Sequence, residues 1–190
     1  MTQARVKASL LVSFLLLSAL ALAQSQPFTI GMRDACDPGT FTANVGPGTC
    51  KPGNHGTTKF NIFIGELQSD HIAGAWRFNP LLDATQGTFQ LTTVNLSTGQ
   101  TTSLQNTGGE THTFTKVASF GGGIVPALNQ LSGNPTPAPE CLHPENSTNI
   151  FVEAGTTETG PTAGSDQLPR GTTNWECCIH PWMRMTINVQ

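Results

Sequence analysis

The sequence predicts an all-β fold, a sandwich or barrel of short strands. Stretches rich in β-branched and aromatic residues alternate with turn signals. The 190-residue chain contains 20 glycines and 13 prolines, and no long stretch has helical periodicity. Met185, Ile187 and Val189 alternate with polar residues near the end of the chain, which predicts a strand with one buried face. The expected strands lie at 75–80, 87–96, 101–107, 111–117, 149–154, 173–179 and 184–189.

The first 23 residues have the pattern of a secretory signal peptide. Arg5 and Lys7 precede an uncharged apolar run that ends in a small-x-small cleavage pattern, Ala21-Leu22-Ala23. The run is shorter than the ~20 residues that cross a bilayer as a helix. We therefore expect a mature chain that starts at Gln24, has no membrane span after cleavage, and lies in the periplasm or outside the cell.

Behind the signal peptide we expect an N-terminal extension at 24–74, followed by the sandwich domain at 75–190. The extension is turn-rich, and a bridge between Cys36 and Cys50 would close a short loop with little core of its own. Its later part, FNIFIGELQ at 60–68, is expected to be a short helix that packs on the sandwich.

Composition excludes several classes of function. The chain has nine Lys and Arg residues and twelve Asp and Glu residues, and no basic cluster follows the apolar run. Nucleic-acid binding needs a cationic surface, so we expect no nucleic-acid partner. Low charge also argues against electrostatic steering of a partner, and we expect a monomer. Paired carboxylates, a nucleophile elbow, a phosphate-binding loop and additional His-x-His pairs are all missing, so we do not expect an enzyme.

The motif WECCIHPWMRM contains a thiol, an imidazole and a thioether, Cys177, His180 and Met183, in Cys-x2-His-x2-Met spacing. A mixed nitrogen and sulfur donor set suits copper. One more imidazole would complete a His2Cys site with a weak axial methionine, the blue-copper arrangement. His112, in NTGGETHTFT, can supply it from the start of a strand.

These two motifs, followed by an alternating final strand, resemble the cupredoxins, the family of type 1 blue-copper proteins. The loop spacing is similar to that of amicyanin and its relatives. The resemblance covers about 87–190 and implies a Greek-key β-sandwich that binds one copper ion. Carried over by position, His112, Cys177 and His180 become the equatorial ligands and Met183 the axial ligand.

The resemblance implies an exported electron-transfer protein whose redox partner docks near Trp182 and His180, on an exposed apolar rim. An alternative from another class is a periplasmic copper carrier, a storage protein or a copper-stress binding protein, without a dedicated redox partner. A third alternative is a metal-free structural domain.

Other residues compete for these roles. Cys178 could replace Cys177 as the thiolate, although this breaks the Cys-x2-His spacing and uses the opposite strand face. Met185 fits a longer, plastocyanin-like loop, but it shares the period of the core residues in the final strand. Glu110 would share a strand face with His112 and could approach the copper.

The odd number of cysteines leaves one of five free if the other four are bridged. We expect a bridge from Cys141, within a long insertion at 119–147, to Cys178. The competing interpretation is a second metal site built on Cys141 and His143. The remaining histidines, at 55 and 71, have no partners at ligand spacing, which favours surface or turn positions.

Overall fold

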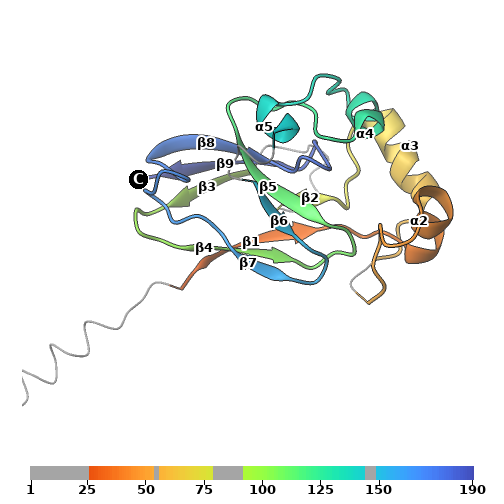
Figure 1. Cartoon of the computed structure of the whole chain (residues 1–190), viewed down its shortest axis with the longest axis horizontal. Helices are drawn as coiled ribbons and strands as arrows, with labels where there is room; N and C mark the ends of the chain where they lie inside the picture. Colours follow the sequence, from red (N-terminus) through yellow and green to blue (C-terminus); the bar gives the residue numbers. More distant parts are fainter. Residues whose placement is uncertain (1–25, 54–55, 79–91, 144–148) are drawn as a thin grey trace, which may run out of the picture.

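The computed structural model describes residues 26–53, 56–78, 92–143 and 149–190, and they form a sandwich of two β-sheets (Figure 1). One sheet has the order β2-β1-β4-β7 and the other has the order β3-β9-β8-β5-β6. The first comprises β1 (Phe28–Arg33), β2 (Arg77–Phe78), β4 (Thr102–Asn106) and β7 (Thr157–Thr159). The second comprises β3 (Thr92–Leu96), β5 (His112–Val117), β6 (Ile150–Val152), β8 (Gly171–Glu176) and β9 (Arg184–Val189). The predicted all-β sandwich is confirmed.

Most of the predicted strands correspond to observed ones. The predictions for 101–107, 111–117, 149–154 and 184–189 match β4, β5, β6 and β9. The strand predicted at 173–179 starts earlier and ends at Glu176, because the chain turns away from the sheet at Cys177. β2 covers Arg77 and Phe78 of the strand predicted at 75–80, while residues 75 and 76 lie in a turn and 79–80 lie outside the described residues. β3 covers 92–96 of the strand predicted at 87–96, and 87–91 lie outside the described residues.

The segment 24–74 contributes a strand that the sequence analysis did not predict. β1 pairs in parallel with β4, with Ile30 opposite Leu104, and antiparallel with β2. Ile30 and Met32 are fully buried and point into the space between the sheets. Their period-2 spacing was a strand signal, but turn-rich sequence follows directly and obscured it. β1 therefore belongs to the sandwich itself, whereas the helical parts of the same segment lie at one end of the strands (Figure 1).

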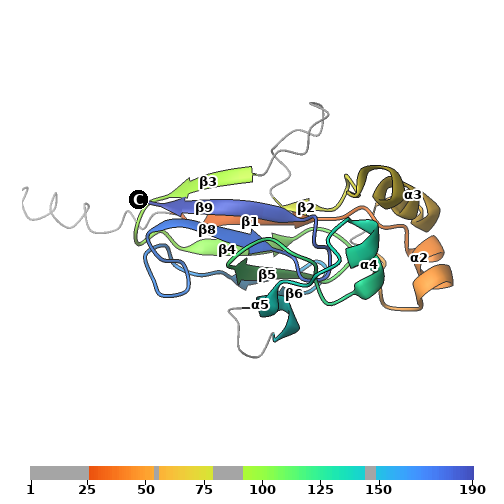
Figure 2. The ribbon, with the colours of Figure 1, turned by 90° about the horizontal axis from the view of Figure 1, so that it is seen from above.

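Within the described residues, four short helices accompany the sheets: α2 (Pro38–Val45), α3 (Phe60–Asp70), α4 (Pro126–Leu131) and α5 (Pro139–Leu142). The helix predicted at 60–68 is α3. The other three begin with a proline in the first turn, where its missing N–H costs nothing. In α2, the Asp37 side chain also accepts a hydrogen bond from the Thr40 amide at 2.9 Å. α2, α3 and α4 gather at one end of the strands, away from the C-terminus (Figures 1 and 2).

The main core fills the space between the sheets. Phe114 stacks on Trp175, with ring centroids 4.3 Å apart, and Phe78 meets Phe114 edge to face. A second, smaller apolar cluster lies outside this core and contains Val117, Ala138, Cys141 and Cys178. The polar end of the main core, next to α2 and α3, holds the candidate site.

The predicted signal peptide, 1–23, lies outside the described residues. Among those residues, no helix is both long enough and apolar enough to cross a membrane.

Candidate metal centre

Three buried side chains bring one sulfur and two nitrogen atoms together. The Nδ1 atoms of His112 and His180 are 3.2 Å apart. The Cys177 Sγ lies 3.9 Å from the first and 3.7 Å from the second. All three residues are at most 2% exposed, so the donor atoms face one another in a pocket closed to solvent.

Two neighbouring strands position these groups. His112 begins β5, Cys177 follows the last residue of β8, and the two strands pair antiparallel with Thr115 opposite Glu176. The Cys177 Sγ accepts hydrogen bonds from the backbone N–H groups of Thr113, at 3.3 Å, and of His180, at 3.4 Å. These two contacts aim the sulfur at the imidazoles from both sides.

The loop between β8 and β9 is a tight turn that ends at Met183, the predicted axial ligand. The Cys177 amide donates to the Met183 carbonyl at 3.0 Å, and the Met183 amide donates to the His180 carbonyl at 2.9 Å. The Met183 side chain is buried in the main core at the end of this turn. Met185 lies one step into β9, opposite Trp175, which agrees with the core role expected for it.

Each imidazole meets a buried carboxylate on its other nitrogen. The His112 Nε2 is 3.1 Å from Asp34 Oδ2, and the His180 Nε2 is 3.4 Å from Glu110 Oε2. Asp34 was not singled out from the sequence. Glu110 was considered as a group that could approach the metal, and the structure places its carboxylate on the outer nitrogen of His180 instead.

Burial and mutual contact shift the protonation of the three groups. Burial alone would raise the pKa of Cys177, but hydrogen bonds from His112 and His180 and their attraction hold it well below its ordinary value. Burial would lower the pKa of His112, yet its hydrogen bonds with Asp34 and Cys177 raise it. Likewise, hydrogen bonds to Cys177 and Glu110 outweigh burial and raise the pKa of His180 to about 10. A thiolate is therefore favoured in this pocket, and it is balanced by positive charge.

An aromatic layer covers the site on the side of α2 and α3. His180 packs edge to face on Trp182, with ring centroids 5.5 Å apart, and Trp182 packs on Phe63 of α3 at 5.9 Å. Phe63 in turn contacts Trp76 at 4.6 Å. Trp182 is only 9% exposed and His180 only 2%. The exposed apolar rim expected at these two residues is therefore not found, because Phe63 of α3 packs on Trp182 and Trp182 packs on His180.

The disulfides agree with the pairing expected from the sequence. Cys36 is bridged to Cys50 and Cys141 to Cys178, and Cys177 is the only free cysteine, in a chain whose five cysteines all lie in described segments. A second group of potential ligands, Asp34, Cys36 and Glu110, lies nearby. Its sulfur is in a disulfide, and its carboxylates already serve the two imidazoles, so it does not form a separate site.

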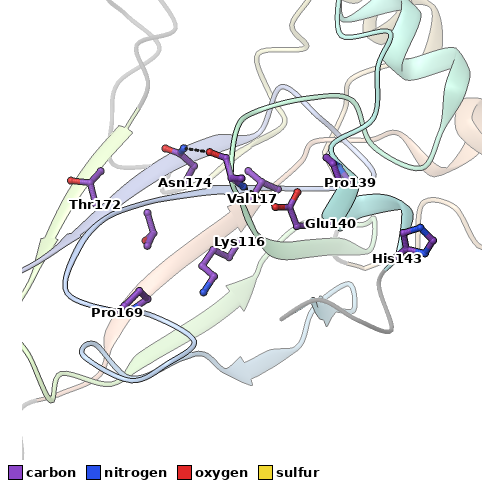
Figure 3. A pocket seen from close by; sticks show the side chains of 10 residues that line it. Lys116, Val117, Pro139, Glu140, His143, Pro169, Thr172 and Asn174 are labelled. Atoms are coloured by element: carbon purple, nitrogen blue, oxygen red, sulfur yellow. Dashed lines mark hydrogen bonds between the residues drawn. The ribbon is translucent and has the colours of Figure 1, made fainter.

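The two other histidines that the structure describes, His71 and His143, lie apart from the centre. His71 ends α3 and its Nδ1 lies 2.8 Å from the Leu131 carbonyl oxygen, and residue 55 is outside the described ranges. His143 lines an open pocket of about 740 Å³ beside α5, together with Lys116 and Glu140 (Figure 3). None of the four predicted ligands lines this pocket.

No protein-family model and no curated protein matches the sequence. Among solved structures, the chain is similar to a purple cupredoxin from Nitrosopumilus maritimus, at 11% identity and a TM-score of 0.41, over 86% of this chain and 99% of that one. It is also similar to a reduced mutant of amicyanin, at 15% identity and a TM-score of 0.33, over 53% of this chain and 70% of that one.

Proposed function

We propose that this protein is a single-copper, type 1 electron-transfer protein in which His112, Cys177 and His180 hold the ion and Met183 is its axial ligand. The observation that carries the proposal is the convergence of two Nδ1 atoms and one sulfur, 3.2 to 3.9 Å apart, in a buried pocket. The donor set alone is typical of one class of metal site. Two imidazoles, a thiolate and a nearby methionine are the ligands of blue-copper centres.

The spacing of the donor atoms fits a first-row metal ion. With about 2.0 Å to each nitrogen and about 2.3 Å to sulfur, values typical of zinc sites, donor atoms around one ion lie about 3–4 Å apart. The three observed separations fall in this range. The lowered pKa of Cys177 supplies the thiolate that a metal requires. The methionine in the same turn favours copper over zinc.

Electron transfer is supported by how firmly the protein holds these groups. When bound, copper supplies a one-electron couple between Cu(I) and Cu(II). Backbone amides fix the Cys177 sulfur, the Cys141–Cys178 bridge ties the next residue to α5, and carboxylates hold both imidazoles. Residues held in this way would shift little when a bound ion gains or loses an electron, and their burial excludes water, so the reorganisation that accompanies transfer would be small.

The same burial separates the electron carrier from the alternative, a protein that stores or delivers copper. Delivery needs ligands that a recipient can reach, whereas His180 is 2% exposed beneath Trp182. Docking of a redox partner near these two residues remains a prediction. A partner on this side would be separated from His180 by the aromatic layer of Phe63 and Trp182. Two disulfides support an oxidising compartment, the periplasm or the cell exterior.

Reconstitution with one equivalent of Cu(II) tests the proposal. We expect an intense visible band from thiolate-to-copper charge transfer, a small copper hyperfine splitting in electron paramagnetic resonance, and a reversible one-electron potential. Cys177→Ser should abolish the band, and Cys178→Ser, the matched neighbour, should retain it. Loss of the band in Cys178→Ser alone would overturn the ligand assignment. A protein that binds only Cu(I) and releases it to a chelating peptide would support the alternative.

A further inference from the structure

The outer nitrogens of the two imidazoles meet buried carboxylates from distant parts of the chain. Asp34 follows β1 and is 78 residues from His112, and Glu110 lies in the turn before β5, 70 residues from His180. The side chains of Asp34 and His112 are 0% exposed, and those of Glu110 and His180 are 7% and 3% exposed. Carboxylates that hold the outer nitrogen of a metal-binding histidine fix both its tautomer and its ring orientation.

Three backbone N–H groups of the described residues donate to the Asp34 carboxylate. Its Oδ1 accepts hydrogen bonds from the backbone amides of Cys36, at 3.2 Å, and Gly109, at 2.9 Å. Its Oδ2 accepts one from the backbone amide of Glu110 at 2.9 Å. With three amides already donating, the carboxylate acts on His112 as an acceptor. A side chain added at Gly108 would collide with this carboxylate, so the glycine turn before β5 allows the close approach. The hydrogen shared with His112 therefore resides on Nε2 and leaves Nδ1 to face Cys177.

Glu110 acts in the same way on the second imidazole. Its Oε2 accepts a hydrogen bond from the Trp76 Nε1, a group that can only donate. The same oxygen lies 3.4 Å from the His180 Nε2, so this nitrogen also carries a hydrogen toward it. The Glu110 carbonyl accepts the Asn106 amide group at 2.7 Å, which fixes the turn. Trp76 packs on Phe63 and Phe41, so the anchor of His180 reaches into α3 and α2.

We propose that Asp34 and Glu110 are positioning residues that lock both imidazoles in the Nε2–H tautomer, with both Nδ1 atoms directed at the metal. The proposal rests on the copper site proposed above and extends it to two residues that do not touch the ion. The two carboxylates also place negative charge beside the centre. This charge favours the oxidation state with the higher positive charge, so removing it should raise the midpoint potential.

Nuclear magnetic resonance of the Cu(I)-loaded wild-type protein tests the tautomers directly. We expect two imidazole N–H protons, both assigned to Nε2 and both slow to exchange with solvent. A ring that carries its proton on Nδ1, or whose Nε2 proton exchanges at the rate of an exposed histidine, would overturn the proposal for that ring. Because this measurement uses the unaltered chain, it stands even if a variant fails to fold.

Two isosteric variants then separate the two anchors. Asp34→Asn should remove the protected proton of His112, Glu110→Gln should weaken that of His180, and both should shift the visible band and raise the midpoint potential. Glu153→Gln is the matched control, because it removes one negative charge from an exposed side chain bound to Lys51 and Thr111. Equal shifts in the control and the two variants, or none in any, would overturn the proposal.

The outcomes distinguish this inference from the function itself. Wild-type protein without a charge-transfer band would refute the copper site. A wild-type band with unchanged variants would leave the copper site standing and refute the role of Asp34 and Glu110.

Discussion

Cys177 and Cys178 are adjacent in the chain, but they belong to two different parts of the interior. Cys177 lies in the main core beside two imidazoles, whereas Cys178 lies in the small apolar cluster and is bridged to Cys141 of α5. The turn that follows β8 therefore supplies a free thiol to one side and a structural bridge to the other. The chemistry of each cysteine is set by the groups that its face meets.

The carboxylates of the two regions show the same contrast. On the side of Cys177, Asp34 and Glu110 accept hydrogen bonds from ring and backbone N–H groups. On the side of Cys178, the fully buried Glu176 accepts a hydrogen bond from the Gly121 amide at 3.1 Å, with the Arg184 Nε at 3.6 Å and the bridged Cys141 Sγ at 3.6 Å. Burial, partly offset by Gly121 and Arg184, raises the pKa of Glu176 to about 8. One region stabilises charge through dense hydrogen bonding, and the other accommodates a carboxyl group that tends to be neutral.

Removal of the Cys141–Cys178 disulfide should have the largest effect at a fixed pH, because it should destabilise the region of Cys178 and leave the metal centre intact. In Cys141→Ser/Cys178→Ser we expect the free energy of unfolding to fall by about 2–5 kcal/mol, because the unfolded chain regains the freedom of a loop of 37 residues. The copper band should persist, since neither residue is a proposed ligand. Denaturant unfolding and the visible spectrum measure the two effects. Loss of the band with the bridge would show that the two regions are not independent.

A change of pH should act mainly on the region of Cys178. The Glu176 pKa is about 8 in the folded chain, against an ordinary value of 4.5. Between these values the folded chain retains a proton that the unfolded chain releases, so stability should fall as pH rises through this window and level off above it. A shift of about 3.5 pKa units corresponds to a loss of about 5 kcal/mol across the whole window.

Unfolding of the copper-loaded protein at several pH values between 5 and 9 checks this. Glu176→Gln should flatten the dependence, and Glu158→Gln, on the exposed strand β7, should leave it unchanged. Equal slopes in the wild type and Glu176→Gln would contradict the assignment.

Substitutions of Met183 and Met185 should have the smallest effect on stability, and they distinguish the proposed axial ligand from its neighbour in β9. Met183→Leu and Met185→Leu conserve volume, so each should cost less than about 1.5 kcal/mol of stability. Only Met183→Leu should shift the midpoint potential, because Met185 packs in β9 opposite Trp175. Protein-film voltammetry of both variants measures the shift. A shift in Met185→Leu alone would move the axial assignment to that residue.

The parts of the site that the sequence revealed are local. Cys177, His180 and Met183 lie in one turn, and strand alternation alone indicates that Cys178 faces the other way. The cysteine count then pointed to its bridge with Cys141, which the structure confirms. The ligand set itself stays a prediction, although the structure brings His112, Cys177 and His180 together.

The parts that the sequence did not reveal depend on long-range packing. Asp34 reaches His112 only because β1 pairs with β4. No residue spacing in the sequence predicts that these two strands pair. The burial of Trp182 likewise depends on α3 folding back over the final turn. The sequence analysis expected Trp182 and His180 on an exposed rim, since α3 lies more than 100 residues before them in the chain.

The cover over His180 also determines how the ion would leave. With the imidazole beneath Trp182 and its outer nitrogen held by Glu110, a chelator has no ligand edge to attack. Exit then requires a local opening of α2 and α3, the kind of partial unfolding that precedes global unfolding. We therefore expect the rate of copper loss to become independent of chelator concentration. Metal retention would then depend on the rate of this local opening as well as on affinity.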